Sequence, residues 1–320
     1  MRFIVFGAGG VGGSIGARLH LKKYDVVFIA RGTHGEILQS DGLRFVSPAH
    51  DVRVQVPTVL HPRDVEWRDE DVVLLCVKSQ QTEAALGDLR AASHDAIPVI
   101  CCQNGVANES MALRNFSHVY AMCVMLPAEH LEPGTVISFA DSAAGSLNMG
   151  RFPSGTDETA NAVTAALRDA GFLSEADATV MRFKYAKLLM NLGNGVQAAC
   201  GEWSHDIGET LKNEALTVLE AEGIDVATFE DLESIRKFNR GVPMQGFKRH
   251  GGSSLQSILR ATGNIEVDYL NGEIVALGRK HGIPTPANLA VQRVALAASA
   301  ANKAGTYCSL DDLRKMMARG

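Results

Sequence analysis

The stretch from Arg2 to Arg31 constrains the fold more than any other part of this chain. An apolar run over residues 3–6 leads into a glycine-rich motif over 7–12, and apolar residues then recur at helical spacing over 14–22. A second apolar run follows over 26–30. This order predicts a strand, a glycine turn, a helix and a second strand, which is the dinucleotide-binding unit of doubly wound folds.

The glycine motif reads Gly7-Ala8-Gly9-Gly10-Val11-Gly12. We expect Gly7 to permit a tight turn, Gly9 to let the backbone approach a pyrophosphate, and Gly12 to let the helix pack closely on the strand. The free N–H groups at the helix start would then face the anion. A glycine-rich turn without a ligand is the alternative, and the position of the motif between a strand and a helix favours the dinucleotide.

Arg31 ends the second apolar run, where NAD-specific folds carry an acidic residue that binds the ribose 2′-hydroxyl. A guanidinium offers a fork of donors that suits the extra phosphate of NADP, whereas a carboxylate would repel it. The sequence therefore predicts NADP(H) as the cofactor. The alternative is an ordinary solvated arginine at a strand end.

Strands continue to alternate with helices through the first half of the chain, which predicts a doubly wound parallel sheet. The near-continuous apolar run over 71–78 is typical of a central strand that is buried on both faces. Other expected elements are helices over 34–40 and 82–92, paired short strands over 43–45 and 52–56, strands over 98–103 and 118–124, and strands over 136–139 and 147–150 that could pair across a loop. Asn108 and Glu109 fall at a helix start, where capping explains them.

From about residue 175 only helical periodicity remains, so we expect an all-α second domain. Its predicted helices cover 181–200, 209–222, 256–260, 266–280, 287–300 and 311–318, with Pro286 in a first turn and Ser309 as an N-cap. The predicted domains are therefore 1–175, an NADP-binding Rossmann-type domain, and 176–320, an all-helical substrate and catalytic domain. A cleft is expected at the carboxyl ends of the sheet strands, facing the helical domain.

The composition excludes several classes of function. A net charge of −5 argues against a nucleic-acid partner, and no apolar run reaches the ~20 residues that span a bilayer. The six cysteines form no C-x-x-C pair and indicate small buried side chains in a reducing compartment. The ten histidines show no metal-ligand spacing, so we expect no metal. Because the first predicted strand begins at residue 3, we expect no secretory leader and a cytoplasmic protein.

Lys187, Asn191 and Asn194 are the first candidates for chemistry. Their spacing of four and then three residues would place them along one stripe of a helix. A lysine beside two carboxamides can donate a proton while the amides orient a polar substrate. Lys184, one turn earlier, competes for the same role. A lysine that snorkels from an amphipathic helix, with solvated asparagines, is the alternative.

Two further sets of polar residues are candidates. Glu266 lies at a predicted helix start, where an acid is ordinarily favoured by the helix dipole. Ser253 and Ser254 precede it and could bind a carboxylate or cap the next helix. Lys78 and Asn104 end two predicted buried strands at the cofactor side of the sheet, where they could contact substrate or cofactor, or simply be polar strand ends.

The order of these motifs, from residue 1 to about 286, resembles the ketopantoate reductase (2-dehydropantoate 2-reductase) family. The motifs are Gly7 to Gly12, Arg31, Val77-Lys78, Gln103-Asn104-Gly105-Val106, Lys187-Leu188-Leu189-Met190-Asn191, and Glu266-Val267-Asp268-Tyr269-Leu270-Asn271-Gly272. The resemblance implies NADPH-dependent reduction of 2-dehydropantoate to pantoate, a step toward pantothenate and coenzyme A.

The same resemblance implies a role for each matching residue. Lys187 would be the general acid, chosen over Lys184 by the family pattern Lys-x-x-x-Asn, and Glu266 would help to hold the substrate hydroxyl or the lysine. The remaining implied contacts are Asn104 and Asn191, which orient substrate and nicotinamide, Asn194 at the substrate, Ser253 or Ser254 at its carboxylate, and Lys78 near both cofactor and substrate.

The chain departs from the family pattern at places that touch the substrate. The family often carries an asparagine where this chain has Gly195, and an acid where it has Ser257. The segment from Lys237 to His250, which includes Arg240, Lys248 and Arg249, is unusually basic and is either an exposed loop or a contact for an anionic substrate. These differences leave the particular 2-oxo acid open.

Two other functions remain to be weighed. One is the NADPH-dependent reduction of a different 2-oxo acid or ketone. The other is a non-catalytic NADP(H)-binding sensor, which the joint presence of Lys187, Asn191 and Glu266 argues against. The apolar helices of the second half could pair between subunits in a homodimer or form an internal core.

Overall fold

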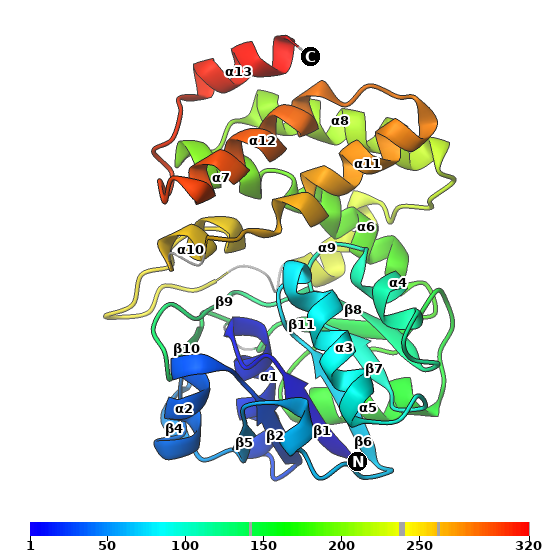
Figure 1. Ribbon diagram of the computed structural model, residues 1–320, viewed down its shortest axis with the longest axis vertical. Helices are drawn as coiled ribbons and strands as arrows, with labels where there is room; N and C mark the ends of the chain where they lie inside the picture. Colours follow the sequence, from blue (N-terminus) through cyan, green and yellow to red (C-terminus); the bar gives the residue numbers. More distant parts are fainter. Residues whose placement is uncertain (141–142, 237–240, 261–262, 320) are drawn as a thin grey trace. The chain divides into compact units, whose positions relative to one another are not determined.

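The computed structural model describes residues 1–140, 143–236, 241–260 and 263–319, and they fall into two compact units (Figure 1). The first unit comprises residues 1–104, 108–181 and 229–249, and the second comprises 105–107, 182–228 and the chain from 250 onward. The sequence places one boundary at 175, whereas the chain passes from the first unit to the second at 181 and returns for residues 229–249.

A seven-stranded sheet forms the centre of the first unit, in the order β11-β8-β7-β6-β1-β2-β5. Six of the strands are parallel, and β11 pairs antiparallel with β8 at one edge. The strands are β1 Arg2–Phe6, β2 Asp25–Ile29, β5 Thr58–Val59, β6 Asp71–Leu75, β7 Val99–Cys101, β8 Val119–Met125 and β11 Ser146–Arg151. This is the doubly wound order, so the predicted fold class is confirmed.

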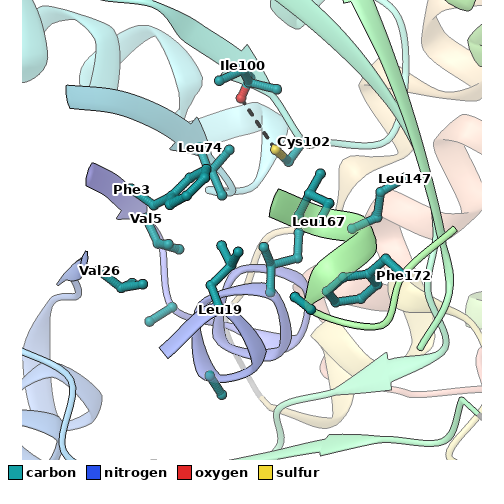
Figure 2. Close-up of a cluster of buried hydrophobic side chains, with 14 of the residues drawn as sticks. Phe3, Val5, Leu19, Val26, Leu74, Ile100, Cys102, Leu147, Leu167 and Phe172 are labelled. Atoms are coloured by element: carbon teal, nitrogen blue, oxygen red, sulfur yellow. Dashed lines mark hydrogen bonds between the residues drawn. The ribbon is translucent and has the colours of Figure 1, made fainter. Parts of the chain in front are cut away.

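Helices cover both faces of this sheet. They are α1 Gly10–Leu21, α2 Gly32–Ser40, α3 Thr82–Ala92, α4 Asn108–Leu113 and α5 Glu158–Asp169. Side chains of α1 and α5 fill one core with Phe3 and Val5 of β1 (Figure 2). Side chains of α3 and α4 fill the other with Ile4 and Phe6 of the same strand. The strand is apolar throughout because its alternate residues enter different cores.

A second, four-stranded sheet has the order β4-β3-β10-β9. Its strands are β3 Leu43–Ser47, β4 His50–Val54, β9 Ala128–Glu129 and β10 Thr135–Ser138. The expected pairing of 43–45 with 52–56 is confirmed as the β3–β4 hairpin. The expected pairing of 136–139 with 147–150 is wrong, because β10 joins β3 and β11 joins β8 in the other sheet. Alternation predicts strands but not the partner that each one finds.

The second unit is helical. Its helices are α6 Val180–Asn191, which begins in the first unit, α7 Asn194–Cys200, α8 His205–Ala221, α10 Ser253–Leu259, α11 Asn271–His281, α12 Pro286–Ala300 and α13 Leu310–Ala318, together with the 3₁₀ turn Glu266–Tyr269. Pro286 lies in the first turn of α12, and the Ser309 hydroxyl accepts from the Asp312 N–H, as expected. Gly282 ends α11 in the left-handed conformation.

Two predicted helices are divided in the structure. The helix expected over 181–200 is broken at Leu192 and Gly193, where the Asn271 side-chain amide donates a hydrogen bond to the Leu192 carbonyl at 3.1 Å. The helix expected over 266–280 begins as a 3₁₀ turn, and its α-helical part starts at Asn271. The single helical stripe predicted for Lys187, Asn191 and Asn194 is therefore wrong, because Asn194 opens a new helix.

The basic segment is partly described. Lys237 and Arg240 lie outside the described residues. The helix α9, Phe229–Arg236, and residues 241–249 belong to the first unit, where the Val242 N–H donates to the Phe139 carbonyl at 2.8 Å and the Arg44 guanidinium lies over the Phe247 ring. Residues 241–249 of this segment thus belong to the sheet-containing unit, and His250 belongs to the second unit. Among the described residues, no helix is both long enough and apolar enough to cross a membrane.

Candidate active site

The glycine motif adopts the geometry that each glycine was expected to allow. Gly7 has a φ of +102°, and a Cβ there would lie 2.9 Å from the Val77 nitrogen. A Cβ at Gly12 would lie 2.1 Å from the Gly7 carbonyl oxygen, so the helix approaches the strand as closely as the backbone permits. Gly9, by contrast, faces open space, with only the His130 ring 4.0 Å from an added Cβ.

The start of α1 suits an anion. Gly9 is the N-cap, no described side chain caps the helix, and its first turn carries no acidic residue. The first N–H groups of the helix therefore keep their donors for a ligand, and the dipole favours negative charge there. An open backbone face at Gly9 beside this helix end fits the diphosphate of a nicotinamide dinucleotide.

His34 ties the glycine turn to the second sheet. Its Nε2 lies 2.9 Å from the Ala8 carbonyl and therefore carries the proton, while its Nδ1 accepts from the Gly134 N–H at 2.9 Å. The His34 ring also contacts the His130 ring, with centroids 4.1 Å apart and the ring planes inclined by 47°. Burial lowers the pKa of His34, and the hydrogen bond to Ala8 only partly offsets this. Sequence patterns did not single out His34, because its partners are 26 and 100 residues away.

Arg31 is the N-cap residue of α2 and lies two residues after the end of β2. Its guanidinium lies over the Phe6 ring and 3.3 Å from the Asp88 carboxylate of α3. Half of the Arg31 side chain remains exposed, so its donors can reach a solute as well as Asp88. Arg31 thus has both a ring and a carboxylate as neighbours, and its role at the cofactor stays a prediction.

Lys78 and Asn104 follow two strands that are adjacent in the sheet, β6 and β7, each by three residues. The sequence predicted that these two residues end the strands, but the strands end earlier, at Leu75 and Cys101. The structure still brings their loops together, because the Ser79 hydroxyl donates to the Asn104 carbonyl at 3.4 Å. The Asn108 side chain donates to the same carbonyl at 3.1 Å and to the Ser79 hydroxyl at 3.2 Å.

Asn108 does more than begin a helix. It is fully buried, and its side-chain oxygen accepts from the Thr82 hydroxyl at 2.8 Å, which in turn accepts from Gln103 at 2.8 Å. Glu109 is fully buried as well. Capping was therefore an insufficient explanation for these residues: Asn108 joins the loops that follow β6 and β7 and holds the Asn104 backbone in place.

In the second unit, α6 carries Lys184, Lys187 and Asn191. Both lysines are buried, with 3% and 9% of their surface exposed, although lysine seldom lies inside a protein unless it is paired. The snorkelling alternative is therefore wrong. Lys187 and Asn191 are one turn apart on the same helix face. The Asn191 Nδ2 is buried and has no hydrogen-bond partner within the described residues.

Asn194 lies beside the start of α10. Its Oδ1 would be 2.9 Å from a Cβ at Gly252, and the Gly252 N–H donates to the Gln197 side chain at 2.7 Å. Ser253 and Ser254 follow Gly252 directly and open α10. Both hydroxyl oxygens are buried without a hydrogen-bond partner in the described part of the chain, so neither serine acts as a cap. Gln197 was not predicted, since its partner lies 55 residues away.

Gly195 explains one departure from the family pattern. A Cβ at this position would lie 2.7 Å from Val291 and 3.2 Å from the Asn271 side-chain oxygen. An asparagine side chain would therefore not fit at 195. The neighbouring side-chain amide in this chain is that of Asn194, and it faces Gly252.

Glu266 is buried in the 3₁₀ turn, with 3% of its surface exposed. It acts electrostatically on Arg260 of the second unit: burial lowers the pKa of Arg260, and the Glu266 charge opposes that shift. Arg260 also donates to the Ser257 hydroxyl at 3.2 Å. Ser257, which stands where the family pattern has an acid, is thus a hydrogen-bond acceptor here.

A buried network of side-chain amides stabilises the chain between α6 and α7 and the start of α11 and α12. Asn271 donates to the Leu192 carbonyl and to Asn288, whose own amide donates to the Leu211 carbonyl and to Glu214. Both asparagines are fully buried. The Glu214 carboxylate also accepts the first N–H groups of α12, from residues 287 and 288. The network fixes the break after α6 and hence the directions of Asn191 and Asn194.

A glycine cradle at a helix N-terminus, an arginine after β2, and a helical unit with buried lysines and carboxamides define an NADP-dependent oxidoreductase. The chain belongs, in particular, to the ketopantoate reductase family. Residues 3–154 match the family model described as Ketopantoate reductase PanE/ApbA, and residues 179–298 match its C-terminal counterpart. The family assignment made from the sequence is confirmed.

Individual relatives agree with this assignment. A 2-dehydropantoate 2-reductase of Archaeoglobus fulgidus is 30% identical over 90% of this chain and 94% of its own length, and one of Halobacterium salinarum is 29% identical over 89% and 95%. A PanE/ApbA family ketopantoate reductase from Ralstonia eutropha matches 95% of this chain and all of its own with a TM-score of 0.80 and 26% identity. D-mandelate dehydrogenase, in a ternary structure with NADH and anilino(oxo)acetate, has the same fold (TM-score 0.80, 23% identity, 94% of this chain and 99% of its own).

Proposed function

We propose that this chain reduces 2-dehydropantoate to (R)-pantoate with NADPH, and that Lys187 is the general acid. Three buried polar groups without described partners, at Asn191, Ser253 and Ser254, carry this proposal. Buried polar atoms are rarely left unsatisfied unless a ligand, an ion or water completes them. A small hydroxylated 2-oxo acid supplies the acceptors and donors that such groups lack.

Each residue then has a defined task. Lys187 donates a proton to the carbonyl oxygen of the substrate as negative charge develops there. Asn191 and Asn194 orient the substrate, and Ser253 or Ser254 binds its carboxylate. Glu266 holds the substrate hydroxyl or the Lys187 ammonium. Bound NADPH supplies the hydride.

The cofactor would be held by the residues of the first unit. The backbone from Gly7 to Gly12 cradles the diphosphate, Arg31 binds the 2′-phosphate, and Lys78 and Asn104 lie toward the nicotinamide and the substrate. In this assignment the first unit, which contains most of residues 1–175, binds NADP(H), and the second, drawn from residues 176–320, binds the substrate and provides the acid.

A panel of 2-oxo acids, with NADPH consumption followed by absorbance, tests the proposal. We expect 2-dehydropantoate to give the highest kcat/KM. A higher kcat/KM for a 2-oxo acid that lacks the hydroxyl of 2-dehydropantoate would favour the second candidate, a reductase of another 2-oxo acid. Gly195 and Ser257 motivate this candidate, because both stand where the family pattern has a polar or acidic side chain. Tight NADPH binding without turnover on any substrate would favour a sensor.

A cytoplasmic location and a homodimer complete the proposal. The six cysteines are all free thiols, in keeping with a reducing compartment. Light scattering of the purified chain measures its mass in solution, and a mass of one chain at all concentrations would exclude the homodimer.

A further inference from the structure

The Arg31 guanidinium shares its surroundings with a carboxylate from another element. Asp88, in the middle of α3, places its Oδ2 3.3 Å from the Arg31 Nη2. The Asp88 side chain is one-third exposed and that of Arg31 is half exposed, so both face the same solvent-accessible place beside β2. The Phe6 ring lies under the guanidinium and limits the directions in which it can point.

His61 is a second neighbour of the same carboxylate. Its Nδ1 accepts from the backbone N–H and the Nε–H of Arg63, at 3.2 and 3.1 Å, and so has no proton of its own. The ring proton is therefore on Nε2, which lies 3.6 Å from the Asp88 Oδ2, just beyond hydrogen-bond distance. Asp88 therefore has a second polar neighbour, His61, besides Arg31.

A carboxylate in this place acts in opposite directions on the two nicotinamide cofactors. It competes with a 2′-phosphate for the Arg31 donors and repels its charge. It can also accept a hydrogen bond from a ribose 2′-hydroxyl, as the acidic residue after the second strand does in NAD-binding folds. Here that acid comes from α3, so inspection of position 31 alone does not reveal it.

We propose that Asp88 is a specificity-determining residue that lowers the preference of this chain for NADPH over NADH. The proposal rests on the assignment of Arg31 to the 2′-phosphate. When NADPH binds, Arg31 turns its donors from Asp88 to the phosphate, and Asp88 stays with His61. When NADH binds, the Arg31–Asp88 pair persists and the carboxylate faces the 2′-hydroxyl.

The test is to measure the dissociation constants of NADPH and NADH for Asp88→Asn, which keeps the shape and removes the charge. We expect NADPH to bind about tenfold more tightly, the scale of a unit charge acting on a phosphate at a solvent-exposed site. NADH should bind equally or more weakly. The fragments 2′,5′-ADP and 5′-AMP, which lack the nicotinamide, should show the same contrast, and about 1 M salt should reduce it.

Asp169→Asn is the matched control. It removes the same charge from a carboxylate that pairs with Lys22 at 3.6 Å, beyond the opposite end of α1 from the glycine turn. It should change neither dissociation constant. Failure of the unsubstituted chain to bind NADPH at all would overturn the cofactor assignment. With NADPH bound by that chain, an unchanged NADPH-to-NADH ratio in Asp88→Asn, or weaker NADPH binding, would overturn the role of Asp88 alone.

Discussion

At some glycines of this chain, the neighbouring atoms leave no room for a side chain, not even for a Cβ atom. At Gly12 it would lie 2.1 Å from a backbone oxygen, and at Gly195 it would lie 2.7 Å from Val291. The role of Gly12 could be predicted because it depends on neighbours within one strand–turn–helix unit. The role of Gly195 could not, because Val291 and Asn271 reach it from helices far along the chain.

Arg31→Asp is expected to reverse the charge that faces the 2′-phosphate and to place it beside Asp88. NADPH binding should weaken by at least about a hundredfold, since a charge-assisted contact is lost and a repulsion is gained. NADH binding should change far less. Titration of both cofactors checks this, and equal losses would mean that Arg31 does not contact the phosphate.

Lys187→Ala should lower kcat by roughly two to four orders of magnitude, the usual contribution of a general acid, while NADPH still binds. Lys184→Ala is the matched control, because Lys184 is also buried and lies one turn earlier on α6. Steady-state rates and NADPH titrations of both variants decide between the lysines. Near-normal turnover in Lys187→Ala, with a large loss in Lys184→Ala, would transfer the role.

The pKa of His34 is lowered in the folded protein, so the unfolded chain binds the proton more readily. The contribution of His34 to stability is therefore present above the unfolded value of 6.5 and is lost as the pH falls below it. His34→Gln cannot titrate and should flatten the decline of the melting temperature between about pH 7 and pH 5. Parallel curves for the two proteins would contradict this.

Whole elements differ in how far local sequence determines them. The helix over 82–92 forms as predicted, because its spacing and its first-turn acid both favour it. The division after α6 was missed, since it depends on Asn271, 79 residues from the carbonyl that it binds. The strands β10 and β11 were recognised, but their assignment to different sheets depends on partners that alternation does not specify.

Strand β1 is fastened to β6 by a buried ion pair. The Arg2 guanidinium donates twice to Asp71, at 2.7 Å each, and the Arg68 N–H donates to the same carboxylate. Asp71→Asn should destabilise the first unit by about 3–5 kcal/mol, because Arg2 would be left buried without its counter-charge. Denaturant unfolding measures the loss.

Asp51→Asn provides the comparison for Asp71→Asn, since Asp51 pairs with Arg44 on the surface. An exposed pair contributes little, so the unfolding midpoint should hardly move. Similar unfolding midpoints for the two variants would show that the Arg2–Asp71 pair contributes no more to the free energy of unfolding than a surface pair does.

At the scale of the molecule, the two compact units are not contiguous halves of the chain. Residues 229–249 belong to the sheet-containing unit, although they lie between helices of the other. Periodicity indicates that α9 has an apolar face, but it does not say which core receives that face. Residues 241–249 of the basic segment contact Phe139 and Arg44 of the same unit, a placement that their charge alone did not predict.

The sequence by itself determined the doubly wound sheet, the helical second half, the glycine turn, Arg31 and the family, since each depends on local spacing or on motif order. Only the tertiary structure decided which groups meet: Asp88 with Arg31, His34 with the glycine turn, and Asn194 with the start of α10. The physical reason is that backbone preferences act over a few residues, whereas ion pairs, buried amide bonds and close packing join residues that only the folded chain brings within reach.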